Sequence, residues 1–148
     1  MKFDHLGVVV ADISLGRKHF SKIYGINRWT KEYYDEINGV IVQFGEDETG
    51  GFCYELIAPI DKRSPIYNAL MNRDRILNHV AYLVDDIDYY YNENLKDDFI
   101  ILAEPKKAIA YGMSYIQFFL SKKHNYILEL IQSSGHKHVF YKNEINEC

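Results

Sequence analysis

The stretch LNHVAYLVDDI, residues 77–87, decides the fold expected of this 148-residue chain. Its apolar and β-branched residues predict a strand, which carries His79 near its start and ends at an Asp-Asp-Ile sequence. The same pattern opens the chain as FDHLGVVVADI, residues 3–13, and places His5 at the equivalent position. The two histidines are 74 residues apart, which is half the length of the chain. We therefore predict that one structural unit occurs twice.

Two glutamates keep the same spacing. Glu55 in the sequence YELI and Glu129 in the sequence LELI also lie 74 residues apart. Each stands among apolar or aromatic neighbours, where an ionised carboxylate without a partner costs several kcal/mol. Taken alone, such a glutamate is interpreted as a solvent-facing residue of an edge strand, and such a histidine as a core or surface residue. The shared register of all four side chains instead predicts that they belong to one site.

The composition is ordinary for a globular protein, with 47% hydrophobic and 26% charged residues. A net charge of −4 argues against a nucleic-acid-binding surface, which is normally basic. No apolar run approaches the roughly 20 residues that a membrane-spanning helix needs. The two cysteines, Cys53 and Cys148, do not indicate a disulfide framework. We therefore expect a single-domain cytoplasmic protein that binds neither nucleic acid nor membranes.

The predicted elements give both halves the order strand, helix and three strands. Asp12 or Ser14 is a candidate N-cap for the first helix, Gly25 ends that helix, and Asn38-Gly39 predicts a hairpin turn. Strands are expected at 2–11, 28–34, 40–44, 52–57, 77–84, 99–102, 115–120 and 126–131, and helices at 14–25 and 87–95. The expected boundaries are module one at 1–58, a linker with a short helix at 59–75, module two at 76–132 and a polar tail at 133–148.

A duplicated module whose halves meet at a pseudo-twofold axis brings both histidines and both glutamates together. Two imidazoles and two carboxylates make a mixed nitrogen and oxygen site suited to Zn, Ni, Co, Mn or Fe as divalent ions. An octahedral ion with four protein ligands would keep two positions for water or substrate oxygens. The predicted fold class is therefore α+β, with two tandem βαβββ modules that form a cupped mixed sheet around a metal site. The predicted ligands are His5, Glu55, His79 and Glu129.

The sequence resembles the vicinal oxygen chelate superfamily, whose members pair two βαβββ modules around a divalent metal. The motifs that carry the resemblance are DHLGVVV at 4–10, YELIAP at 54–59, SPI at 64–66, NHVAY at 78–82 followed by VDDI at 84–87, and ILELI at 127–131. Within the superfamily these motifs are most similar to methylmalonyl-CoA epimerases. Epimerases usually have Gln where this chain has Glu55, and the ordered set His, Glu, His, Glu is similar to bacterial glyoxalase I enzymes. The Asp-Pro-Asp-Gly turn typical of glyoxalases is absent, and SKKHN at 121–125 stands in its place.

The resemblance implies an enzyme of a particular kind. It implies a metal-dependent isomerase or epimerase that removes a proton alpha to a carbonyl or thioester and stabilises the enolate on the metal. Glu129 and Glu55 are then catalytic candidates besides being ligands, and Glu129 is expected to shuttle a proton. Glu36 lies near the place where epimerases have an acid–base glutamate, and its alternative interpretation is a solvated charge.

Two other functions stay open. One is a glyoxalase I-type lactoylglutathione lyase, and the other is a binding protein of the same fold that holds a drug or metabolite without turnover. The complete ligand set argues against the binding protein. The expected partner is a small molecule, either a CoA or a glutathione thioester, and Lys106-Lys107 would contact a CoA phosphate or simply be exposed. The resemblance also implies a homodimer.

Overall fold

The computed structural model describes residues 1–72 and 77–133, and in them the predicted α+β class is confirmed. The first half contains β1 (Lys2–Val9), α1 (Ile13–Tyr24), β2 (Arg28–Trp29), β3 (Tyr33–Asp35), β4 (Val40–Glu46) and β5 (Cys53–Pro59). The linker contains α2 (Tyr67–Asn72). The second half contains β6 (Leu77–Val84), α3 (Ile87–Tyr90), the π-helical turn η1 (Tyr91–Leu95), β7 (Phe99–Ile101), β8 (Lys106–Ala108), the 3-10 turn η2 (Ile109–Tyr111), β9 (Ser114–Ser121) and β10 (Ile127–Gln132).

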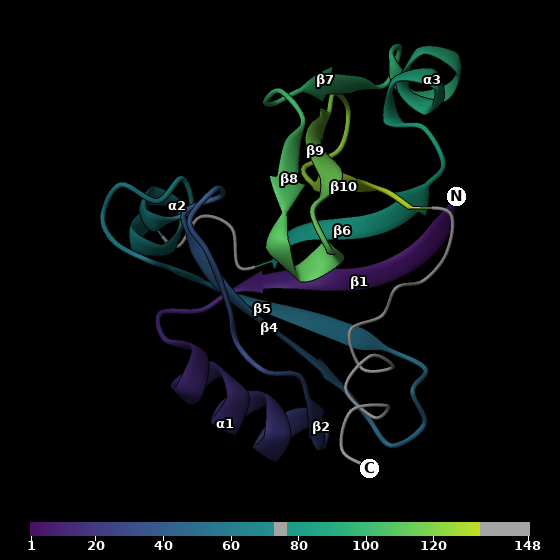
Figure 1. Cartoon of the computed structure of the whole chain (residues 1–148). Coiled ribbons are helices and arrows are strands. Elements are labelled where there is room, and N and C mark those ends of the chain that lie inside the picture. The colour runs from purple at the N-terminus through teal and green to yellow at the C-terminus, as the bar shows by residue number, and fades with distance from the viewer. Residues whose placement is uncertain (73–76, 134–148) are drawn as a thin grey trace.

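The strands form one curled mixed sheet that does not close on itself (Figure 1). The main strand order is β2-β4-β5-β1-β6-β10-β9-β7, with β3 paired to β4 and β8 paired to β9. The two halves join where β1 runs antiparallel to β6. On either side, the last strand of each half lies parallel to the first, β5 beside β1 and β10 beside β6. The strand order read outward from the centre is therefore the same in both directions.

The helices begin where the sequence offers a cap. Asp12 precedes α1, and its Oδ1 accepts a hydrogen bond of 2.8 Å from the backbone N–H of Leu15. Asp86, the equivalent residue of the second half, caps α3 through a bond of 2.8 Å from the N–H of Tyr89. Gly25 ends α1 in the left-handed conformation with φ 67°, which a residue without a Cβ adopts without strain. In Figure 1 α1 lies against β4 and β5, and α3 lies beyond β7.

Strand alternation divides the core into a helix side and a concave side. Leu56 of β5 is fully buried and packs with Ile13 and Phe20 of α1. Its neighbour Glu55 therefore faces the opposite, concave side of the sheet, where it lines a cavity. On β10, Leu130 packs under α3 in the same way, which leaves the residue before it facing the concave side.

Some expectations are not tested by this structure. The short strand β8 was not predicted, because three residues that include two lysines carry no strand pattern. The expected polar tail lies outside the described residues apart from Ser133, as do residues 73–76. The module boundaries stay a prediction. No helix in the described part of the chain has the length and apolar content to span a membrane.

Candidate metal centre

Two rows of paired residues across the central strands build the site. In the first row, Glu55 of β5 pairs with Gly7 of β1, and Gly7 pairs with His79 of β6. Residues paired across a sheet point to the same face, so both polar side chains of this row project into the concave side. The second row repeats the first at the spacing of 74 and contains His5, Ala81 and Glu129. Each row thus places one histidine and one glutamate on either side of a small residue.

The small residue between the ligands is a steric requirement. A Cβ added to Gly7 would lie 2.1 Å from Cε1 of His79, far inside the contact distance of two carbon atoms. The imidazole of His79 therefore lies over the backbone of β1 in space that only a glycine leaves. Ala81, which holds the equivalent place beneath the second row, is fully buried.

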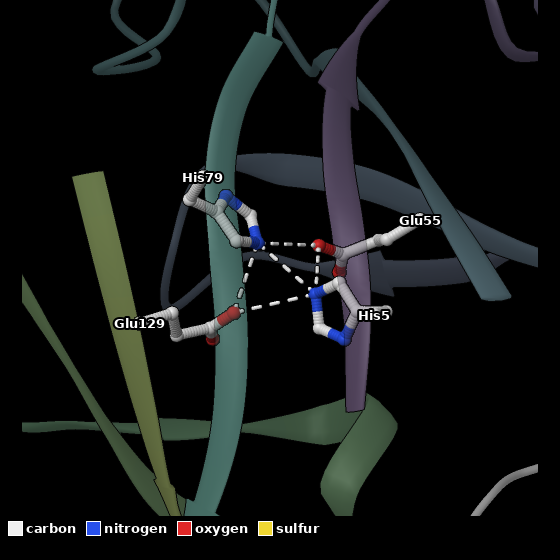
Figure 2. A group of neighbouring side chains, drawn as sticks. All are labelled: His5, Glu55, His79 and Glu129. Atoms are coloured by element: carbon white, nitrogen blue, oxygen red, sulfur yellow. Dashed lines mark hydrogen bonds and ion pairs between the residues drawn. The ribbon is translucent and has the colours of Figure 1, made fainter. Parts of the chain in front are cut away.

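The four side chains converge from four strands onto one point (Figure 2). The Nε2 atoms of His5 and His79 are 3.0 Å apart. Oε2 of Glu55 lies 3.1 Å from Nε2 of His5 and 3.3 Å from Nε2 of His79. Oε2 of Glu129 lies 3.4 Å and 2.9 Å from the same two atoms. Ligands bonded to one cation at about 2.0–2.2 Å lie about 3.0 Å apart at right angles and about 3.5 Å apart at a tetrahedral angle. The observed spacings fit such a shell.

The donor atoms themselves also fit a cation. Oε2 of Glu129 is buried and makes no hydrogen bond within the described part of the chain, although nitrogen lies close to it. Nδ1 of His5 bonds to Oδ2 of Asp4 at 2.8 Å, and Nδ1 of His79 bonds to Oδ1 of Asn78 at 2.8 Å. An oxygen acceptor keeps the proton on Nδ1, and the lone pair of each Nε2 then faces the centre. All four residues are buried, with exposed fractions between 0% and 8%.

Without a metal, the carboxylates would hold the imidazoles as cations. Burial lowers the pKa of His5, but the charge of Glu55 and hydrogen bonds from Asp4 and both glutamates raise it well above its usual value. His79 behaves alike: burial lowers its pKa, and Glu129 followed by Glu55 raises it overall. Burial raises the pKa of Glu55, but the two histidines outweigh burial and lower it to about 2.

A cavity of about 370 Å³ opens above the centre. Glu55, His79 and Glu129 line it, whereas His5 is fully buried and does not. Most of the other lining side chains are aliphatic or aromatic, among them Val42, Ile116 and Phe118. Exposed Glu104 and Lys106 also line it and mark its rim. The arrangement can therefore hold an apolar chain with its polar end at the four ligands.

The structure brings together the four predicted ligands and leaves Glu36 apart from them. Glu36 is exposed in the turn after β3 and does not line the cavity. Asp35, the residue before it, is buried and does line the cavity. The Asp35 carboxylate accepts hydrogen bonds from the backbone and side-chain N–H groups of Asn38 and from the backbone N–H of Ile109. A proton-transfer role for Glu36 finds no support in this placement.

Sequence reasoning also missed residues that hold the ligands. Asp4, Asn78 and Gly7 stand inside the quoted motifs, and the spacing of 74 relates Asp4 to Asn78. That relation was a usable signal for a conserved role in both halves. Tyr111, whose hydroxyl bonds to Asp4, has no polar counterpart 74 residues earlier, because Ile37 stands there.

Comparison with known proteins identifies the family. Residues 4–118 match the model of the Glyoxalase/Bleomycin resistance protein/Dioxygenase superfamily. The chain belongs to this superfamily. It is also 24% identical over 138 residues to the uncharacterized protein YqjC of Bacillus subtilis (strain 168), a match that covers 93% of this chain and 96% of that protein.

Two solved structures of the superfamily fold are similar to the chain. Methylmalonyl-CoA epimerase from Mycobacterium tuberculosis has a TM-score of 0.75 and 21% identity, over 90% of this chain and 89% of that one. A Streptomyces coelicolor methylmalonyl-CoA epimerase in complex with 2-nitronate-propionyl-CoA has a TM-score of 0.73 and 21% identity, over 91% and 99% of the two chains. At this level of identity the likeness shows the shared fold.

We predict that Gly7→Ala abolishes high-affinity binding of a divalent metal while the chain still folds. The added methyl group forces the ring of His79 out of the ligand set, because the ring occupies the space of the missing Cβ. Isothermal titration with Co²⁺ or Zn²⁺, beside circular dichroism, measures both effects. Gly25→Ala, at the left-handed end of α1, is the control that strains the backbone away from the site. A Gly7→Ala protein with unchanged affinity would contradict the geometry.

We also predict that metal-free and metal-loaded protein respond oppositely to pH. The raised histidine pKa values stabilise the metal-free fold below about pH 6.5, the usual histidine pKa, and this contribution is lost as the pH rises through the raised values. A metal needs neutral Nε2 atoms, so its stabilisation grows over the same range. The contribution of Glu55 is lost only as the pH falls from 4.5 towards 2.

Thermal unfolding between pH 5.5 and 9, with chelator or with Zn²⁺, tests this expectation. The difference in melting temperature between the two forms should widen as the pH rises. His79→Gln should weaken the pH dependence of the metal-free form. A metal-free melting temperature that rises steadily across this range in the wild type, but not in the variant, would contradict the assignment.

Proposed function

We propose that this protein is a divalent-metal-dependent epimerase or isomerase that removes a proton alpha to a carbonyl or thioester. The observation that carries the proposal is the buried set of two histidines and two glutamates beside a largely apolar cavity. The epimerase-like neighbours within the superfamily support the same assignment. Its native metal among Zn, Ni, Co, Mn and Fe, a cytoplasmic location and a homodimer stay predictions.

A cation held by His5, Glu55, His79 and Glu129 would act as a Lewis acid for the substrate carbonyl oxygen. Glu129 is placed to accept the alpha proton, because it lines the cavity and its Oε2 has no hydrogen bond among the described residues. Glu55 lies across the centre on the other half of the molecule, where it can return a proton to the opposite face of the carbon. The apolar walls exclude water that would otherwise compete for the proton.

We predict that Glu129→Gln lowers exchange of the substrate alpha proton with D₂O by about 10²–10⁴-fold, the range for loss of a general base. Proton NMR of methylmalonyl-CoA in D₂O measures the exchange, and elemental analysis measures the retained metal. Glu36→Gln is the control and should exchange within about twofold of the wild type, because Glu36 is exposed and outside the cavity. Full exchange by a metal-loaded Glu129→Gln protein would remove Glu129 from the mechanism.

A glyoxalase I-type lyase is the second candidate, favoured by the carboxylate of Glu55 in the ligand set. The same metal-loaded protein distinguishes it, with the methylglyoxal–glutathione hemithioacetal in place of the CoA thioester. Turnover of the hemithioacetal alone would favour the lyase. Binding of either compound without exchange or turnover would favour the non-catalytic binding protein.

Lys106 is placed to hold an anionic group of the substrate at the rim. Among the described residues that line the cavity it is the only lysine or arginine, whereas Asp35 and Glu104 add negative charge. The next residue of β8, Lys107, does not line the cavity, and its Nζ lies 5.7 Å from the ring centre of Tyr115. The two lysines therefore form a matched pair with opposite orientations.

We predict that Lys106→Gln raises the KM for a CoA thioester about three- to tenfold with little change in kcat, the result of losing a contact that substrate and transition state share. Lys107→Gln should change KM less than about twofold. The N-acetylcysteamine thioester of the same acid has no phosphates, and Lys106→Gln should not affect its KM. Equal effects of both substitutions would refute the anchoring role of Lys106.

A further inference from the structure

The two histidines pack alike but are held differently. The ring of His5 lies edge-on to Phe44 with centroids 5.4 Å apart, and the ring of His79 lies edge-on to Phe118 at the same distance. The spacing of 74 relates these two phenylalanines as well. The hydrogen bonds at Nδ1 break this symmetry, because the acceptor is a carboxylate at residue 4 and an amide at residue 78.

This difference matters for a metal ligand. A carboxylate can only accept, so Asp4 keeps the proton on Nδ1 of His5 and leaves Nε2 free to bind a cation. It also increases the electron density on the imidazole, which strengthens the bond that Nε2 makes. The amide of Asn78 is neutral and can present either its oxygen or its N–H group. His79 is therefore held less firmly in the binding tautomer.

A third residue supports only His5. The hydroxyl of Tyr111 donates to Oδ2 of Asp4 and lies 2.9 Å from Nδ1 of His5. Tyr111 comes from η2 in the second half of the chain, so it connects that half to the histidine of β1. It is 5% exposed, and its ring also packs edge-on against Phe44 with centroids 5.8 Å apart. Ile37, its counterpart in the first half, is 44% exposed and carries no hydroxyl.

We propose that Asp4 and Tyr111 are positioning residues that make His5 the strongly held ligand of the centre, whereas Asn78 leaves His79 the weaker one. The inference rests on the proposed metal site and goes beyond it, because it ranks two ligands that the duplication alone would make equivalent. Neither Asp4 nor Asn78 is among the four ligands. Their substitutions therefore act on the metal through the imidazoles.

The test compares matched substitutions in the two halves. Asp4→Ala should lower the affinity for Co²⁺ about 10–100-fold, the range for loss of such a supporting partner, and Asn78→Ala less than about threefold. Affinities come from competition with a chromophoric chelator, and the visible d–d spectrum of bound Co²⁺ reports the ligand field. Asp4→Ala should shift that spectrum, while Asn78→Ala should leave it near that of the wild type.

Tyr111→Phe keeps the ring and removes only the hydroxyl, so it covers the case in which Asp4→Ala does not fold. It should weaken Co²⁺ binding less than Asp4→Ala and shift the spectrum in the same direction. Equal losses for Asp4→Ala and Asn78→Ala, or a wild-type affinity and spectrum for Tyr111→Phe, would overturn the ranking. A wild-type protein that binds no Co²⁺, Zn²⁺, Ni²⁺, Mn²⁺ or Fe²⁺ would overturn the proposed metal site itself.

Discussion

The antiparallel pairing of β1 with β6 is the contact on which the candidate site depends. Because this pair lies at the centre of the sheet, the residues on its concave side come from both halves. The parallel neighbours β5 and β10 then bring one glutamate each into register with a histidine. A shift of either central strand by one residue would turn its histidine to the opposite face. The site therefore exists only in this register.

The register also explains why two buried carboxylates and two buried imidazoles are tolerated. Each ion removed from water costs several kcal/mol unless a partner of opposite charge stands beside it. A divalent cation with two glutamates makes a centre of zero net charge. In its absence the lowered pKa of Glu55 and the raised pKa of His5 provide the same neutralisation with protons. Metal and protons therefore compete for one charge requirement of the fold.

The repeat made both the fold class and the four converging side chains predictable from the sequence. His5 and Glu55 recur at one offset in matching strand patterns, and that regularity survives without knowledge of distant contacts. Residues whose position depends on the other half were not predictable in this way. Asp35 stands in a charged run typical of a solvated turn, and it is buried because Ile109, 74 residues away, supplies a backbone donor.

Departures from the duplication carry the information that the repeat cannot. Identical halves would produce a site with two equivalent sides, which suffices to hold a cation but does not distinguish one ligand from another. Tyr111 and Asp4 add a polar contact to one side, and Asn78 leaves the other with a neutral partner. Enzymes of a duplicated fold must bind an asymmetric substrate in one orientation. Differences between paired positions, rather than the shared ligands, are therefore where the specificity of such a centre is determined.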